Sequence, residues 1–408
     1  MRRKDFVTSA LSVAFLGGSG SAALAQAAGA PALPALGGTV DPDNVLVVVQ
    51  MQGGNDGLNT VVPWSDDAYH RVRPAIGVAA AQVLKLNERI GFNPALKGLH
   101  ELYRQGRVAL VQGVGYPNPN RSHFEATQIW ETASPDRPQQ YGWIGRYLDR
   151  RFTSAKPASA FEAVALGDTL PAAMVAAHVE VPAIGALSAY AYNTGRDLAS
   201  KQSAGVLYDG AKQGQSPYLA LIANTAREAY HGGDVLRAQT AAFTNKATYA
   251  SNGFAQQLAL AARLIGSRAG SKIVFVSLGS FDTHAGQRAQ QDRLLGYLGD
   301  GLLSFYQDLA AHGLDGNVLT LTFSEFGRRV QQNASNGTDH GTAMPLFALG
   351  GTVKGGIYGE HPSLTDLDQG DLRFSQDFRS VYATVIAKWL GRDPGAVLGG
   401  QYPTLAFV

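Results

Sequence analysis

The stretch NVLVVVQMQGGNDG, residues 44–57, decides the fold class of this chain of 408 residues. Residues 44–51 form an almost unbroken run of β-branched residues, which is typical of a strand buried on both faces. The run ends in a glycine-rich turn that carries Asp56. Strands of this kind occur in α/β proteins, whose ligands bind in the loops that follow the strands. Asp56 therefore lies where we expect chemistry.

Buried strands and amphipathic helices alternate along the rest of the chain. This pattern predicts an α/β sandwich with a largely parallel central sheet. The alanine-rich stretch 170–250 predicts a mainly helical insertion or lid. Further strands are predicted at 108–114, 161–166, 272–278, 318–323 and 344–349, and helices at 95–105, 123–133, 254–268, 287–311 and 376–390.

The composition excludes several classes of protein. Apolar residues make up 45% of the chain and charged residues 16%, which excludes a disordered chain. There is no cysteine, so any metal must be bound by oxygen and imidazole. Residues 2–5 carry a charge of +2, which equals the net charge of the whole chain, so the remainder is neutral. A neutral body has no net attraction for nucleic acid, and we predict no nucleic-acid partner.

The first 25 residues are predicted to be a signal peptide. Arg2 and Arg3 precede a short, glycine-interrupted apolar stretch, and Ala23-Leu24-Ala25 fits the small-residue cleavage pattern. Paired arginines with a weak apolar region favour the twin-arginine export machinery, with a general secretory signal as the alternative. Residues 26–44 are predicted to be a flexible lead-in. We expect a periplasmic or secreted protein without a stable membrane anchor.

The loops next to the predicted strands carry most of the candidate site residues. Asp282 and His284 are two residues apart, so in extended backbone their side chains point the same way and can meet one ion. His340, before the strand at 344–349, is a candidate third ligand. Carboxylate and imidazole without thiolate predict a divalent metal ion, which could be zinc, manganese, magnesium or calcium.

Two residues have a structural and a functional interpretation. Asp56 either reaches an ion or bonds the backbone amides of its own turn. Ser122 is either a nucleophile at a helix start or the N-cap of a capping box with Glu125. Its neighbour Arg121 could pair with an anionic group or with a surface carboxylate.

The order of the motifs resembles a bacterial family catalogued as domain of unknown function 1501. That family is regarded as part of the alkaline phosphatase and sulfatase superfamily. The resemblance implies one alkaline phosphatase-like domain at 45–408, a three-layer sandwich with helices on both faces of the sheet. The motifs that carry the resemblance are VVVQMQGGNDGLNTVVP (48–63), SHFEATQIWET (122–132), GSFDTH (279–284), SEFGRR (324–329) and TDHGTAMPLFALGG (338–351).

The resemblance also implies roles for individual residues. It makes Ser122 the nucleophile and assigns metal ligands to Asp56, Asp282, His284, Glu325 and His340. The superfamily has an adjacent Asp-His pair where this chain has Glu325-Phe326, so one imidazole ligand is missing. The alternatives are that Asp339 or His123 substitutes for it, or that a single ion binds.

Two functions follow from these expectations. The first is an exported metal-dependent hydrolase of anionic esters, phosphates or sulfates, in which Ser122 attacks and Arg121 assists. The second is a non-catalytic exported binding or assembly protein that keeps the fold with an incomplete metal site. Phe326 favours the second function, and the collected loop carboxylates and histidines favour the first.

Overall fold

A computed structural model describes residues 43–137, 139–152, 161–185, 236–267 and 269–408. The predicted signal peptide and nearly all of the lead-in lie outside these residues, as does the greater part of the predicted insertion at 170–250. The described ends of that insertion hold a 3-10 turn, η1 (Ala172–Met174), and a short helical stretch at 236–240. Among the described residues, no helix is both long enough and apolar enough to cross a membrane.

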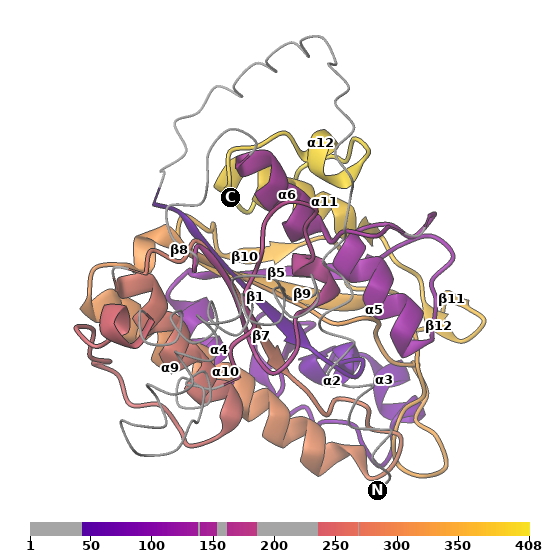
Figure 1. Cartoon of the computed structure of the whole chain (residues 1–408). Coiled ribbons are helices and arrows are strands. Elements are labelled where there is room, and N and C mark those ends of the chain that lie inside the picture. Colours follow the sequence, from indigo (N-terminus) through magenta and orange to yellow (C-terminus); the bar gives the residue numbers. More distant parts are fainter. Residues whose placement is uncertain (1–42, 138, 153–160, 186–235, 268) are drawn as a thin grey trace, which may run out of the picture. The chain divides into compact units, whose positions relative to one another are not determined.

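The main sheet has eight strands and is mostly parallel, as predicted (Figure 1). The strand order is β10-β5-β9-β8-β1-β7-β6, and β13 pairs with β5. Five of the six predicted strands lie within one residue of the expected bounds at each end, and the 161–166 strand begins two residues late. The strands are β1 (Val45–Met51), β5 (Val108–Gly115), β6 (Ala163–Leu166), β7 (Ile273–Leu278), β8 (Val318–Phe323), β9 (Met344–Gly350), β10 (Gly356–Tyr358) and β13 (Gln376–Asp377).

Strand β1 lies inside the sheet because both of its faces are apolar. It pairs in parallel with β7 on one side and with β8 on the other. Alternate residues enter two separate cores: Val47 and Val49 pack on one face, and Leu46 and Val48 on the other. Strand β9 is the exception, because it runs antiparallel to both β5 and β8.

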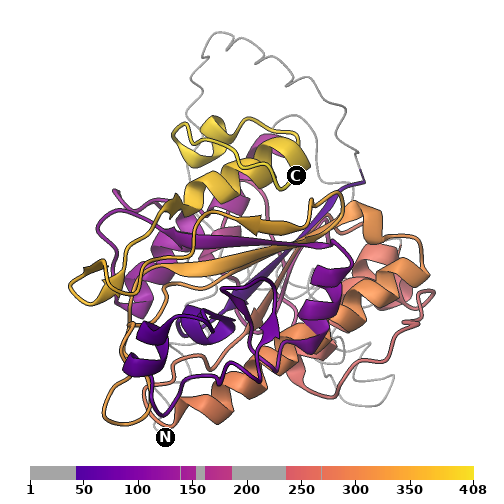
Figure 2. The ribbon, with the colours of Figure 1, turned by 180° about the vertical axis from the view of Figure 1, so that it is seen from behind.

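Helices cover both faces of the sheet, which gives the three predicted layers (Figures 1 and 2). One face packs against α4 (Lys97–Arg104), α9 (Gly253–Gly266) and α10 (Gln287–Ala311). The other face packs against α5 (His123–Thr132), α6 (Trp143–Arg151), α11 (Phe378–Thr384) and α12 (Pro394–Leu398).

Several elements were not predicted because their apolar patterns are short. The helix expected at 376–390 is α11 followed by a π-helical turn, η3 (Val385–Trp389). Helix α6 was not predicted at all. A third apolar cluster lies beneath a small three-stranded sheet. The remaining elements are α2 (Gly57–Thr60), β2 (Val61–Val62), α3 (Asp67–Val72), β3 (Leu84–Lys85), β4 (Gly91–Phe92), η2 (Asp315–Asn317), β11 (Leu367–Asp368) and β12 (Asp371–Leu372).

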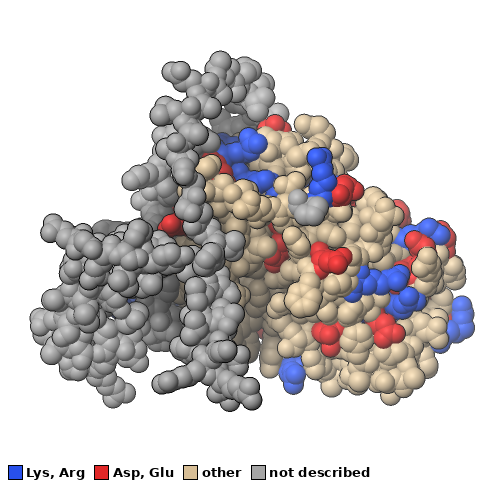
Figure 3. Space-filling model, turned by 45° about the vertical axis from the view of Figure 1, so that its right-hand side comes forward, with Lys and Arg blue, Asp and Glu red and all other residues tan. Residues whose placement is uncertain are grey.

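Charged side chains are interspersed over the surface of the described residues. On the face in Figure 3, lysines and arginines alternate with aspartates and glutamates, and no broad area carries one sign. Local clusters of charge therefore decide what each part of this surface can bind.

Candidate metal centre at one edge of the sheet

Strand direction brings the candidate residues to one edge of the sheet. Strands β1, β5, β7 and β8 run in the same direction, so their carboxyl ends meet at that edge. Strand β9 runs the other way, so the loop that precedes it reaches the same edge and brings His340 with it. His340 would lie at the opposite edge if β9 were parallel to its neighbours.

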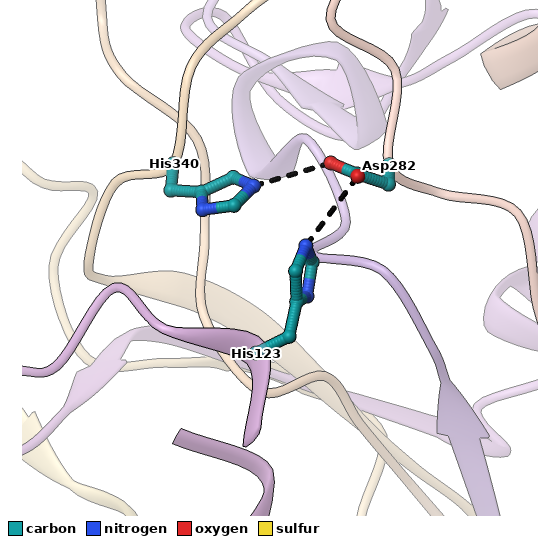
Figure 4. Close-up of side chains that lie close together, drawn as sticks. All are labelled: His123, Asp282 and His340. Carbon is teal, nitrogen blue, oxygen red and sulfur yellow. Dashed lines mark hydrogen bonds and ion pairs between the residues drawn. The ribbon is translucent and has the colours of Figure 1, made fainter. Parts of the chain in front are cut away.

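Three of these side chains offer ligand atoms to one point (Figure 4). One ligand atom from each of His123, Asp282 and His340 lies within 4.8 Å of the other two. The His123 Nε2 atom is 3.4 Å from Asp282 Oδ2, and the His340 Nε2 atom is 3.2 Å from Asp282 Oδ1. The three residues come from α5, from the loop after β7 and from the loop before β9.

His284 extends the cluster on its other side. Its Nε2 atom lies 3.0 Å from Asp282 Oδ1 and 3.0 Å from His340 Nε2. The triad predicted from sequence, Asp282, His284 and His340, is therefore close together. His123, which the sequence offered only as a substitute, shares the aspartate and His340 with that triad. We call these four residues the His/Asp cluster.

An oxygen atom faces the Nδ1 atom of each imidazole in the cluster. His340 Nδ1 is 2.8 Å from the Arg121 carbonyl oxygen, which can only accept a hydrogen bond, so Nδ1 carries the proton. His123 Nδ1 faces Glu325 Oε1 at 2.8 Å, and His284 Nδ1 faces Asp339 Oδ1 at 3.3 Å. In the neutral imidazoles, the Nε2 lone pairs are then free to bind a cation, as in metal-binding histidines.

The Nε2 atom of His123 supports this assignment. It is buried and has no hydrogen-bond partner among the described residues. A buried polar atom without a partner is costly, and a cation between Nε2 and Asp282 would satisfy it.

Arg328 fixes the charge of Asp282. Its buried guanidinium group is 2.7 Å from Asp282 Oδ1. Partial burial would raise the pKa of Asp282, but the hydrogen bond and the positive charge of Arg328 lower it to about 2. Partial burial lowers the pKa of His340. An ionised carboxylate and a neutral imidazole are the forms that bind metal.

Phe326 forms an apolar wall against two of the imidazoles. Its ring centroid lies 4.9 Å from that of His123 and 4.5 Å from that of His340. The ring is buried and also contacts Gly54, where an added Cβ would lie 2.3 Å from it. Phe326 supplies no ligand, so the described residues on this side of the cluster offer no imidazole for a second ion.

Asp56 and Glu325 have other partners. The Asp56 carboxylate forms a buried ion pair with Arg73 at 2.5 Å, accepts a hydrogen bond from Gln287 and caps α2. These contacts give the Asp56 carboxylate a structural role, and its role as a metal ligand stays a prediction. Glu325 is buried, accepts hydrogen bonds from Gly53 N and faces the His123 ring. Glu325 orients the His123 ring and is not itself in the cluster.

Ser122 and Arg121 lie beside the cluster. Ser122 occupies the N-cap position of α5, yet its hydroxyl makes no capping hydrogen bond, and Glu125 pairs with Asn120 instead. The capping-box interpretation is therefore wrong, and the hydroxyl is exposed next to His123. The Arg121 side chain pairs with the buried carboxylate of Asp371, while its carbonyl holds His340.

Comparison with known proteins gives a family match and distant structural similarity. The model of a family described as "Protein of unknown function (DUF1501)" matches residues 43–378. No curated protein sequence matches the chain. Similar solved structures include a lipoteichoic acid synthase from Listeria monocytogenes (10% identity, TM-score 0.37, 90% of this chain and 78% of that one).

Two further solved structures are similar at the same level. One is a sulfatase from Pseudoalteromonas sp. (11% identity, TM-score 0.39, 89% of this chain and 70% of that one). The other is a phosphonate monoester hydrolase from Silicibacter pomeroyi (9% identity, TM-score 0.38, 88% and 75%). Because these identities do not exceed 11%, we infer the function from the side chains of this chain alone.

Proposed function

Since the chain belongs to the DUF1501 family, whose function is unknown, we propose a function from its own site: metal-dependent hydrolysis of phosphate or sulfate esters. One observation carries the proposal. Three imidazole Nε2 atoms converge on Asp282, while an oxygen atom faces the Nδ1 atom of each ring. Metal-binding histidines have this arrangement, in which an oxygen atom holds Nδ1 and Nε2 points to the ion.

His123, Asp282 and His340 would hold one divalent ion, with His284 beside them. Two nitrogen ligands and one carboxylate favour zinc or manganese over magnesium and calcium, which prefer oxygen ligands. When bound, such an ion polarises an ester oxygen and lowers the pKa of a nearby hydroxyl group. Arg328 keeps Asp282 ionised, and Glu325, Asp339 and the Arg121 carbonyl orient the imidazoles.

Ser122 is the proposed nucleophile. Ser122 is exposed, and its hydroxyl is not used as a helix cap. In sequence it directly precedes His123 of the cluster and follows Arg121, whose carbonyl oxygen holds His340. Its Oγ would form a bond to phosphorus or sulfur as the ester oxygen leaves with a proton as the alcohol. Water would then cleave the serine ester and release phosphate or sulfate.

A non-catalytic role is the second candidate, and Phe326 is the observation that favours it. With an apolar ring against His123 and His340, the site offers ligands for a single ion, which could be purely structural. Such a protein would bind metal and gain stability from it without any turnover of esters.

The metal part of the proposal is tested by metal analysis of the purified chain. We expect about one equivalent of zinc or manganese in the wild type, and much less in His123→Ala and Asp282→Ala, because water replaces these ligands poorly. His178→Ala is the matched control, since His178 is an exposed histidine that no cluster residue contacts, and it should retain the metal. Full metal content in both cluster variants would contradict the site.

The hydrolase part is tested on metal-loaded protein with aryl phosphate and aryl sulfate esters. We expect Ser122→Ala to abolish turnover with a stability change below about 0.5 kcal/mol, because the hydroxyl caps no backbone amide. Ser134→Ala, at the other end of α5, should retain turnover. A metal-bound wild type without turnover of any ester would favour the non-catalytic role instead.

We also propose export, on the pattern of residues 1–25. The paired arginines and Ala23-Leu24-Ala25 predict maturation near Ala25 and transport by the twin-arginine route. N-terminal sequencing of the exported protein checks the cleavage site. Normal export in cells that lack the twin-arginine translocase would contradict the route.

A further inference from the structure

A pair of arginines lies next to the His/Asp cluster and shares a single buried carboxylate. Asp371, on β12, has a side chain that is 1% exposed. One of its oxygens pairs with Arg121, and the other lies 3.8 Å from Arg329 Nε. Two positive groups therefore face one buried negative group, while the carboxylate of Asp339 also interacts with Arg329 and that of Asp368 with Asp371.

Both arginines present part of their guanidinium groups to solvent. The side chain of Arg121 is 37% exposed and that of Arg329 is 35% exposed. Arg329 uses Nη1 to hold the Gln369 carbonyl oxygen, and Arg121 uses Nη2 to hold Asp371. Each guanidinium carries five N–H groups, so several donors on each remain for a ligand.

The backbone ties this arginine pair to the candidate metal centre. The Arg121 carbonyl accepts the hydrogen bond from His340 Nδ1, and the Arg329 amide donates to the Asp339 carbonyl at 3.0 Å. Arg121 also directly precedes Ser122. An anion bound by the arginines would thus lie beside an ester bound at the cluster.

We propose that Arg121 and Arg329 form a second anion subsite, and that the substrate carries a second phosphate or sulfate group beside the ester that is cleaved. The planar guanidinium fork matches the oxygen atoms of such groups. Asp371 holds the Arg121 fork, lies near Arg329 and lowers the local charge, so that release of the product stays possible. The role of the subsite in binding a substrate rests on the proposed function, whereas its ability to bind an anion does not.

Titration of inorganic sulfate into the chelator-treated chain, followed by calorimetry, tests the subsite without the metal. We expect sulfate to bind, and Arg121→Gln and Arg329→Gln each to weaken binding at least tenfold. Arg373→Gln is the matched control, because Arg373 is an exposed arginine that directly follows β12 and pairs with Asp366. It removes the same charge and should change the affinity less than twofold.

Three outcomes separate this inference from the proposed function. An equal loss in all three variants, or no binding by the wild type, overturns the subsite. Arginine-dependent sulfate binding without ester turnover supports the subsite while the hydrolase proposal fails.

With active enzyme, Arg329→Gln should raise KM at least tenfold for a doubly charged ester but not for a singly charged one. An unchanged KM ratio would overturn the inference alone. Arg329→Gln keeps the Arg121–Asp371 pair, so a folding defect of Arg121→Gln leaves the test intact.

Discussion

At the scale of single residues, Glu131 is a buried acid that the proposed mechanism does not use. It lies on α5, is 4% exposed and accepts a hydrogen bond from Ala173 N at 3.2 Å. Burial raises its pKa from 4.5 to about 7, the Ala173 bond opposes this, and the charge of Glu325 adds to it. The folded chain therefore holds this proton to a higher pH than the unfolded chain does.

Glu131→Gln should stabilise the protein increasingly as the pH rises from 4.5 to 7. Below pH 4.5 the carboxyl is protonated in both states and contributes no pH dependence. Above it the unfolded chain loses the proton first, so the wild type loses stability up to pH 7, by a total on the order of 3 kcal/mol. Glutamine keeps the hydrogen bond and cannot ionise. Urea unfolding at pH 4.5 and pH 8 measures the difference, and equal gains at both would contradict the assignment.

At the scale of elements, α4 and α10 pack through two glycines. A Cβ at Gly98 would lie 2.3 Å from the carbonyl oxygen of Gly299, so only glycine lets the helices approach this closely. Gly98→Ala must push the helices apart, which typically costs about 1–3 kcal/mol and outweighs the gain of about 1 kcal/mol in helix propensity. Gly253→Ala, at the start of α9, meets nothing within 4 Å and is the control. Thermal unfolding should show Gly98→Ala as the less stable variant, and the reverse order would refute close packing here.

At the scale of the whole molecule, Arg328 joins the loops that form the site. Its guanidinium group donates to the carbonyl oxygens of Gly54 and Thr338 at 2.7 and 2.8 Å and also reaches Asp282. A lysine cannot span these acceptors, and each buried group left unpaired costs about 1–3 kcal/mol.

Arg328→Lys should therefore lower both the melting temperature and the metal affinity. Added metal should restore part of the stability, because it binds only the folded state. Arg146→Lys is the matched control: Arg146 likewise donates to backbone carbonyl oxygens, those of Thr132, Tyr141 and Val397, but it bonds no residue of the cluster. It should lose stability while keeping its metal affinity. Equal metal affinity in the two variants would show that Arg328 does not organise the site.

The sequence by itself determined the strands, the main helices and the loops that carry chemistry. A strand buried on both faces is recognised in the sequence by a continuous β-branched run such as residues 45–49. A long helix such as α10 is recognised by apolar residues at helical spacing. Both signals are local, so they can be read from the chain without knowing its partners. The proximity of Asp282 and His284 was predicted from their spacing of two residues.

Only the tertiary structure decided which polar groups meet. Asp56 pairs with Arg73, Glu325 turns to His123, and Ser122 lacks its capping bond, because each choice depends on residues distant in sequence or on competing partners nearby. The reversed direction of β9, which brings His340 to the cluster, depends on the pairing of β9 with β5 and β8. A side chain with several possible partners forms the bond that the packed backbone permits. The neighbouring sequence does not indicate which partner that is.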